Sequence, residues 1–307
     1  MALKRVGVIG SVNRDTIVGE DGTLTQSYGG VLYTALALAY LGRRRVETWL
    51  FGKIGEDVWD EVCRILADGP NVRVDGLKAV ASRNYRTHIR YLTDGSKQER
   101  LVGAIEPLGP QDLQPPLPQL DGLLVNFITG FELSREALES LKRVVRGPVI
   151  IDIHSLTLGR TADGSRFWRR PEDWKDWVRL SDIVQMNVDE AAVLHGGFSS
   201  QDSLSEFGLK LLEMGPRAAV FTRGAEGVFA VYRGARGTEQ LHVSASHPEQ
   251  AVDPTGCGDV FLAGLGAHFC TTGGFESAIR FATKAACLNS RLRGVGSLRK
   301  LVRLELA

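Results

Sequence analysis

The stretch Val-Asp-Pro-Thr-Gly-Cys-Gly-Asp at residues 252–259, with the apolar run that follows it to His268, constrains this chain most. Glycines directly before a helix allow a tight turn and leave backbone N–H groups exposed at the helix N-terminus. Those groups lie at the positive end of the helix dipole and form a pocket for an anion. A carboxylate in that pocket, Asp259, is explained if it accepts a proton from a hydroxyl that attacks a phosphoryl group. The pattern therefore predicts a phosphoryl-transfer site. A glycine-rich turn in which Asp259 is only the N-cap of the helix would have the same sequence pattern.

The composition is that of an ordinary globular protein. Of the 307 residues, 43% are hydrophobic and 24% are charged, and the net charge is +1. This charge gives no reason to expect nucleic acid or an anionic membrane as a partner, and no uninterrupted apolar run reaches the length of a membrane span. The four cysteines form no C-x-x-C pair, and the N-terminus enters a short apolar strand without the features of a signal peptide. We therefore expect a cytoplasmic protein with reduced thiols.

Expected strands and helices alternate along most of the chain. This alternation predicts an α/β fold, with a doubly wound, mainly parallel sheet flanked by helices on both faces. Because residues from both ends must meet on one ligand, we expect a single domain over residues 1–307. The expected strands are 6–9, 48–54, 122–126, 148–153, 183–186 and 218–222. The expected helices include 31–41, 58–67, 134–146, one that begins after Asp259 and ends at about residue 270, and 275–291.

Two segments depart from this alternation. Residues 16–27 alternate loosely around Asp21-Gly22, which is a hairpin signal. Residues 84–92 also alternate and are followed by Asp94-Gly95. They predict a small β-sheet outside the main one, from about residues 14–28 and 83–103. We expect this sheet to be a lid that excludes water, a competing phosphoryl acceptor, and its exposed strands could pair in a homodimer.

Polar residues follow the first expected strand directly. In open α/β sheets, ligands bind just past the carboxyl ends of the strands. Asn13 and Asp15 could both point at sugar hydroxyls, although an Asx-turn is the commoner reason for this spacing. Gly29-Gly30 precedes a helix and would let the backbone approach a ligand. The first loop is not G-x-G-x-x-G, which argues against a dinucleotide-binding dehydrogenase.

Several motifs, taken in order, resemble those of the ribokinase-like (PfkB) carbohydrate kinase family. They span nearly the whole chain, and the last of them is the most specific. The resemblance implies a doubly wound sheet with a β lid, and ATP-dependent transfer of the γ-phosphoryl group to a sugar or sugar-like alcohol. The motifs are Gly10-Ser11-Val12-Asn13-Arg14-Asp15, Gly29-Gly30, Gly52-x-x-Gly55-x-Asp57, Asn187-x-x-Glu190, Thr222-x-Gly224-x-x-Gly227 and Asp253-Pro254-Thr255-Gly256-Cys257-Gly258-Asp259.

The resemblance also implies roles for individual residues. Asp259 matches the catalytic base, and the N–H groups of Gly256, Cys257 and Gly258 match the anion hole for the transferring phosphoryl group. Glu190 matches a position that acts on Mg²⁺ through water, and some family members hold a monovalent cation such as K⁺ near the position of Asp253. The positions matched to the acceptor are Asn13, Asp15, Gly29, Gly30 and Thr34, and those matched to the nucleotide are Asn187, Thr222, Gly224, Gly227 and Asn289.

Some positions depart from the family pattern. Thr34 replaces a frequent Asn, Val31 replaces the Lys of ribokinases, and Ile128 stands where an acidic acceptor contact is usual. A site that loses its hydrogen-bonding partners rejects the original substrate, which argues against ribose. A hexose, a ketodeoxy sugar acid or a nucleoside remains as the acceptor. The alternatives are a nucleoside kinase of the same fold and a catalytically silent nucleotide- or sugar-binding regulatory protein, and the presence of Asp259 speaks against the latter.

Overall fold

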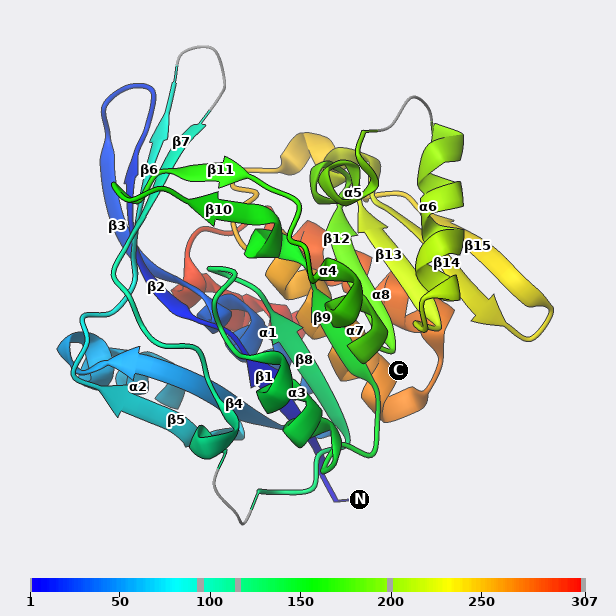
Figure 1. The fold of residues 1–307 in the computed structure, drawn as a ribbon, viewed down its shortest axis with the longest axis horizontal. Coiled ribbons are helices and arrows are strands. Elements are labelled where there is room, and N and C mark those ends of the chain that lie inside the picture. Colours follow the sequence, from blue (N-terminus) through cyan, green and yellow to red (C-terminus); the bar gives the residue numbers. More distant parts are fainter. Residues whose placement is uncertain (1, 93–96, 114–116, 198–200, 305–307) are drawn as a thin grey trace.

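The main sheet of the protein is mostly parallel and is covered by helices on both faces (Figure 1). The computed structural model describes residues 2–92, 97–113, 117–197 and 201–304. The strands of the nine-stranded sheet are β1 (Lys4–Ile9), β4 (Val46–Gly55), β5 (Val72–Val80), β8 (Gly122–Asn126), β9 (Val149–Asp152), β12 (Ile183–Asn187), β13 (Ala218–Thr222), β14 (Val228–Gly234) and β15 (Gly237–Val243).

The strand order is β15-β14-β13-β12-β9-β8-β1-β4-β5. Every neighbouring pair from β13 to β5 is parallel, and β14 and β15 are added antiparallel at one edge. The chain proceeds from β1 toward β5 on one side and from β8 toward β13 on the other. The order therefore reverses between β1 and β8, and this is the point where open α/β sheets bind their ligands. The predicted doubly wound, mainly parallel sheet is confirmed.

Two apolar cores lie on opposite faces of the sheet. Successive strand residues point to opposite faces, so Val8 and Leu124 belong to one core while Ile9 and Val125 belong to the other. The first core contains α1 (Val31–Gly42), α2 (Trp59–Ala67), α7 (Cys257–Thr272) and α8 (Phe275–Asn289). The second is covered by α3 (Arg135–Lys142), α4 (Trp174–Leu180), α5 (Val188–His195) and α6 (Gln201–Glu213).

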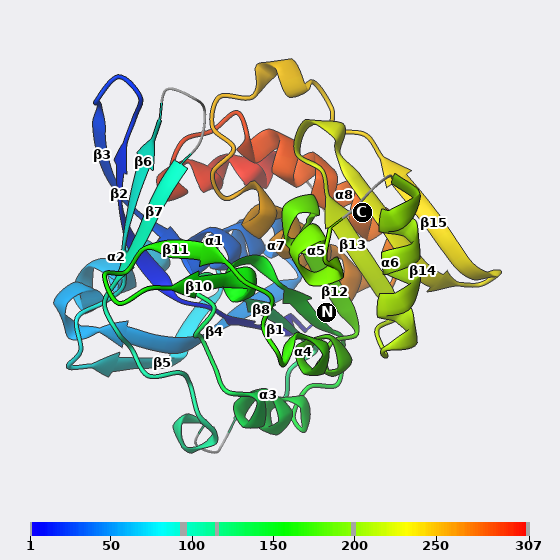
Figure 2. The same ribbon diagram turned by 45° about the horizontal axis from the view of Figure 1, so that its top comes forward.

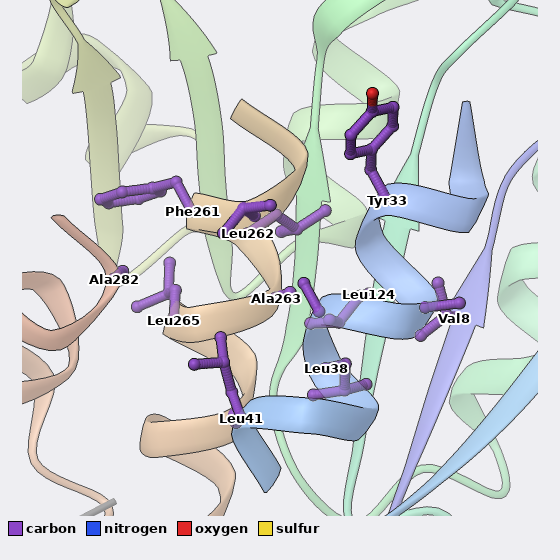
Figure 3. Packing of buried hydrophobic residues seen from close by; sticks show 14 of the residues in the cluster. Val8, Tyr33, Leu38, Leu41, Leu124, Phe261, Leu262, Ala263, Leu265 and Ala282 are labelled. Carbon is purple, nitrogen blue, oxygen red and sulfur yellow. The ribbon is translucent and has the colours of Figure 1, made fainter. Parts of the chain in front are cut away.

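Helices α1 and α7 pack directly against each other, as Figure 3 shows for Leu38 and Leu41 beside Ala263 and Leu265. Nearly every residue of α1 is buried, because the sheet, α7 and the C-terminal 3₁₀ segment surround it. A helix that is apolar all round is expected where no face meets water. This packing fixes the N-terminus of α7 against the middle of the sheet.

A second, small sheet projects from the end of the main one (Figures 1 and 2). Its strands are β2 (Val12–Val18), β3 (Leu24–Gly30), β6 (Arg86–Tyr91) and β7 (Lys97–Val102), in the order β3-β2-β6-β7. Two antiparallel hairpins are joined through the parallel pair β2–β6. The expected turn at Asp21-Gly22 is present, with Gly22 at φ 78°, whereas Asp94-Gly95 lies outside the described residues.

A short hairpin lies beside the small sheet in both views (Figures 1 and 2). It consists of β10 (Leu158–Arg160) and β11 (Arg166–Trp168), and a bridge between Arg100 and Ser165 connects it to β7.

That residues 1–307 form one domain stays a prediction. Among the described residues, no helix combines the length and apolar character that crossing a bilayer requires. The 3₁₀ segments are η1 (Glu56–Val58), η2 (Pro110–Asp112), η3 (His154–Thr157), η4 (Gly224–Glu226), η5 (Pro248–Gln250) and η6 (Val295–Arg303).

Some elements end earlier than the sequence indicates. Helix α3 stops at Lys142 rather than at residue 146, because the chain turns there: the N–H of Val144 bonds to the carbonyl of Leu141, and Val145 bridges to Leu120. Helix α8 stops at Asn289, two residues short of the expected end.

Candidate active site

Polar side chains that end four strands of the main sheet meet at one edge, together with Asn13 of β2. Asn126, Asp152, Asn187 and Thr222 end β8, β9, β12 and β13, and Asn13 lies just past the end of β1. Because these strands are parallel, their carboxyl ends lie on the same edge. The N-terminus of α7 reaches this edge, since Gln185 of β12 donates a hydrogen bond to the carbonyl of Gly258.

The glycine turn before α7 is tight, as the sequence predicts. Gly256 has φ 74°, and a β-carbon there would collide with the ring of Tyr33. The N–H of Cys257 donates to the carbonyl of Pro254 at 3.1 Å. The N–H groups of Gly256 and Gly258 have no hydrogen-bond acceptor within the described part of the chain. Of the three N–H groups expected to bind an anion, those of Gly256 and Gly258 are therefore uncommitted within the described part of the chain, and that of Cys257 is used inside the turn.

Asp259 lies in the first turn of α7 with only 8% of its surface exposed. Its Oδ1 accepts a hydrogen bond of 2.6 Å from Nδ2 of Asn126. Burial raises the pKa of the Asp259 carboxyl, while the charge of His154 and the bond from Asn126 lower it. The carboxylate is therefore desolvated but held by a specific donor, a suitable state for a base.

Two further buried acids, Asp152 and Glu190, belong to the same part of the molecule. Burial raises the pKa of Asp152 well above its usual value, and the charges of Glu190 and Asp259 raise it further. Burial also raises the pKa of Glu190. Gln185 donates to Oδ2 of Asp152 at 3.0 Å, as well as to the Gly258 carbonyl. Like charges gathered in a dry site favour the neutral carboxyl form unless a cation is present.

Asn187 and Glu190 form a capping box at the start of α5. Oδ1 of Asn187 accepts the N–H of Glu190, and Oε2 of Glu190 accepts the N–H of Asn187, both at 2.8 Å. Both side chains are thus engaged locally, which fits an action on Mg²⁺ through water rather than direct ligation. Within the described residues, no three side chains of His, Cys, Asp or Glu are arranged to hold a metal. The cation roles expected of Glu190 and Asp253 stay predictions; Oδ1 of Asp253 accepts the N–H of Thr255.

On the other side of the site, Asn13 and Asp15 lie on β2 of the small sheet. Asn13 donates to the hydroxyl of Thr87 at 3.0 Å, and its Oδ1 is buried without a partner among the described residues. Burial raises the pKa of Asp15 to about 7, against a lowering effect of Thr87; the charges of Glu99 and Asp259 also raise it. The charge of Asp259 thus acts on Asp15, so the small sheet and α7 contribute to one electrostatic environment.

The double glycine brings the backbone close to this acid. A β-carbon on Gly29 would collide with Oδ2 of Asp15. Gly30 has φ 65°, and a β-carbon on it would collide with the carbonyl of Ser11 and lie 3.0 Å from Ile128. Both glycines are therefore required by close approach to other parts of the chain. The expected approach of their backbone to a ligand stays a prediction.

Thr34 occupies a different environment from the one expected. It is fully buried in α1, and its hydroxyl accepts a hydrogen bond of 2.8 Å from Asn126. It lies behind Asn126 as a supporting residue, so a direct contact with the acceptor is not what this arrangement favours.

The expected nucleotide positions fall into two groups. Thr222 ends β13, and Gly224 and Gly227 follow it with φ 54° and 97°. A side chain at Gly227 would collide with the carbonyl of Val243, so the turn needs glycine. Asn289 is buried and donates to the carbonyl of Thr255 at 2.9 Å. It therefore supports the turn before α7, and its expected contact with adenine stays a prediction.

Four polar residues of this site were not predicted from the sequence: Asn126, Asp152, His154 and Gln185. Asn126 and Asp152 each end an apolar strand. The rule that drew attention to Asn13 would have found both, had it been applied to every strand. His154 has φ 35°, which is uncommon for a residue other than glycine, and its sequence gives no sign of this.

Residues 164–300 match the model of the pfkB family carbohydrate kinases. This match covers the C-terminal part of the chain, which is similar to these kinases. Together with the kinase relatives, it shows a phosphotransferase with an alcohol group as acceptor. A fructokinase of Klebsiella pneumoniae is 28% identical over 284 residues, which cover 88% of this chain and 85% of that enzyme. A cytidine kinase of Thermococcus kodakarensis is 26% identical over 289 residues, which cover 91% of this chain and 93% of that enzyme.

The fold is also that of solved ribokinase-like structures. The Arabidopsis thaliana ribokinase complexed with ribose and ATP matches 99% of this chain and 100% of its own, with a TM-score of 0.73 and 22% identity. A pyrophosphate-dependent kinase in the ribokinase family, complexed with a pyrophosphate analog and myo-inositol, matches 98% of this chain and 99% of its own, with a TM-score of 0.75 and 20% identity. At these identities the likeness establishes the fold of this kinase, not its substrates.

Proposed function

We propose that this kinase transfers the γ-phosphoryl group of ATP to a hydroxyl of a sugar or sugar-like small molecule, with Asp259 as the base. The observation that carries the proposal is the position of the Asp259 carboxylate. It is buried in the first turn of α7, close to the uncommitted N–H groups of Gly256 and Gly258. An acid placed beside anion-binding groups is what in-line transfer to an alcohol requires.

The proposed reaction needs one proton transfer and one displacement. The acceptor hydroxyl gives its proton to Asp259 as its oxygen forms a bond to the γ-phosphorus. The bond between the γ-phosphorus and the oxygen bridging to the β-phosphate breaks, and ADP leaves. The N–H groups of Gly256 and Gly258 and the dipole of α7 stabilise the negative charge on the transferring group. Mg²⁺, placed near Glu190 through water, supplies charge neutralisation on the phosphates when it is bound.

Other parts of the chain have supporting roles in this proposal. Asn13 and Asp15 hold acceptor hydroxyls, and the small sheet closes over the acceptor as a lid that excludes water. Thr222, Gly224 and Gly227 contact the nucleotide. The outer strands of the small sheet pair with a second copy, and a K⁺ ion near Asp253 assists the turn before α7.

For the acceptor, we favour a sugar other than ribose. Ile128 is apolar and Thr34 is buried, so the wall beside Gly30 offers few hydrogen bonds. A nucleoside is the second candidate, because the cytidine kinase relative aligns with nearly the whole chain. The fructokinase relative aligns over a similar extent and supports a hexose.

A substrate panel tests the proposal directly. The purified protein is incubated with Mg²⁺ and either ATP or pyrophosphate, together with hexoses, ketodeoxy sugar acids and nucleosides, and phosphorylated product is detected by mass spectrometry. We expect a phosphorylated sugar when ATP is the donor, and no phosphoryl transfer when water is the only acceptor present. Product only from nucleosides would move the acceptor to the alternative. Binding of ATP without any product from the panel would favour the silent regulatory protein and contradict the proposed function.

A further inference from the structure

Asn126 is a fully buried amide at the end of β8, next to the point where the strand order reverses. The four residues before it in β8 are buried glycine, leucine and valine. An amide at such a position costs free energy unless its polar atoms are bonded. Its presence therefore needs an explanation that packing alone does not give.

The hydrogen bonds of Asn126 are directed at the proposed base. Nδ2 donates to Oδ1 of Asp259 at 2.6 Å and to the hydroxyl of Thr34 at 2.8 Å. A carboxylate only accepts hydrogen bonds, so the amide nitrogen, not its oxygen, must face Asp259. The Oδ1 of Asn126 is left buried without a partner among the described residues. The amide is therefore oriented for the carboxylate at the expense of its own oxygen.

The charged and titratable groups around Asp259 come from several elements. The bond from Asn126 and the charge of His154 act against the burial that raises the pKa of Asp259. The other groups on which the Asp259 charge acts are Asp15, Tyr33, Asp152 and Cys257. Among all of these residues, Asn126 is the one that donates a hydrogen bond to the Asp259 carboxylate.

We propose that Asn126 is a positioning residue of the transfer reaction, which fixes the Asp259 carboxylate beside the anion pocket and keeps it ionised until the acceptor arrives. The inference rests on the proposed function of Asp259. A hydrogen bond to an ionised group stabilises the charged form. Removal of the amide therefore leaves the base more easily protonated and free to rotate, while ATP binding is untouched.

The test is the pH dependence of kcat in Asn126→Leu and Asn126→Asp. Leu has a similar volume but no donor, and Asp places a second carboxyl beside Asp259. Because the base must be ionised, kcat rises as the pH passes through the pKa of Asp259 in the substrate complex. We expect this acid limb to move to higher pH by about one unit in Asn126→Leu. At a pH below the limb, kcat of this variant is then roughly tenfold lower than that of the wild type. In Asn126→Asp the limb should move further. Activity should recover at alkaline pH, with KM for ATP unchanged.

Thr34→Val is the matched control. It removes the second partner of the same amide, at an equally buried position, and leaves the donor to Asp259 in place. We expect its acid limb to stay at the wild-type position. If the Asn126 variants lose kcat equally at every pH, or if Thr34→Val shifts the limb as far as they do, Asn126 is a packing residue and the inference is overturned.

A second measurement separates this inference from the proposed function. In protein labelled with ¹³C at aspartate carboxyls, an NMR titration follows the protonation of Asp259 without any turnover, with Asp259→Asn to assign its signal. We expect a higher pKa of Asp259 in Asn126→Asp, which retains the shape of Asn, than in wild type. An unchanged titration overturns the role of Asn126, whereas an inactive wild type with the expected titration overturns only the proposed function.

Discussion

The carboxylate of Asp15 occupies the space that a side chain at position 29 would fill. Gly29 and Asp15 belong to neighbouring strands of the small sheet, and a β-carbon on Gly29 would collide with Oδ2 of the acid. The glycine thus allows Asp15 to lie against the backbone at the mouth of the site. Two motifs that are 14 positions apart in the sequence therefore form one structural unit.

This unit predicts how the acceptor is held. Asp15→Ala should raise KM for the acceptor by about tenfold or more, because a hydrogen bond to a charged group is lost, and should change KM for ATP little. Gly29→Ala should act in the same direction, since its methyl group displaces the carboxylate. Steady-state kinetics with each substrate varied in turn measures both effects. Equal changes in the two KM values would remove Asp15 from the acceptor site.

The pKa of Asp15 also predicts a pH dependence of stability. Burial raises this pKa to about 7 from 3.8. The folded protein then binds a proton more tightly than the unfolded chain does, so the stabilisation is full below about pH 4 and is lost as the pH rises through about 7. Relative to Asp15→Asn, the wild type should lose on the order of 3–4 kcal/mol of unfolding free energy between these limits. Urea denaturation of both proteins at pH 4 to 8 measures the difference, and parallel curves would contradict the raised pKa.

The turn before α7 predicts a contrast between two glycines. Gly256→Ala should destabilise the protein by about 1–2 kcal/mol from the left-handed backbone alone, and further through collision with Tyr33. Gly258 lies inside the helix, and a β-carbon there meets nothing within 4 Å. Gly258→Ala should therefore keep or slightly raise the melting temperature, because alanine favours the helix. Thermal unfolding of the two variants tests this, and equal destabilisation would contradict the turn geometry.

The assignment of Asp259 as base predicts the most severe loss. Asp259→Asn keeps the shape and the burial of the side chain but cannot accept a proton. We expect kcat to fall by about 10²–10⁴-fold, while calorimetry still detects ATP binding with Mg²⁺. Turnover near the wild-type level would exclude Asp259 as the base.

Much of the architecture was predictable from local patterns. The apolar runs ending at Ile9, Asn126 and Asp152 indicate strands because their β-branched and leucine residues are buried on both faces. The uniformly apolar run of α1 indicates a helix without a solvent face. The glycine turn before Asp259 was predictable for a similar reason, since its backbone geometry depends on residues close together in the sequence.

The hydrogen-bond partners of the site residues could not be predicted from local sequence patterns. Asn126 and Asp259 are 133 residues apart and meet only because β8 lies beside β1 and α7 packs across both. Thr34 was expected at the acceptor, but the direction in which it faces on α1 places its hydroxyl behind Asn126. The packing of α8 on α7 places the amide of Asn289 against the carbonyl of Thr255, which the sequence did not indicate, while its contact with the nucleotide stays a prediction.

The sequence by itself determined the alternation of strands and helices, the positions that require glycine, and the acid that follows them. These depend on backbone sterics and on the period of apolar residues, both of which act over a few neighbouring positions. Only the tertiary structure decided which N–H groups of the turn remain uncommitted, which amide holds Asp259, and how far the pKa of Asp15 rises. Hydrogen bonding and desolvation depend on groups brought together from distant parts of the chain, and no local pattern records those encounters.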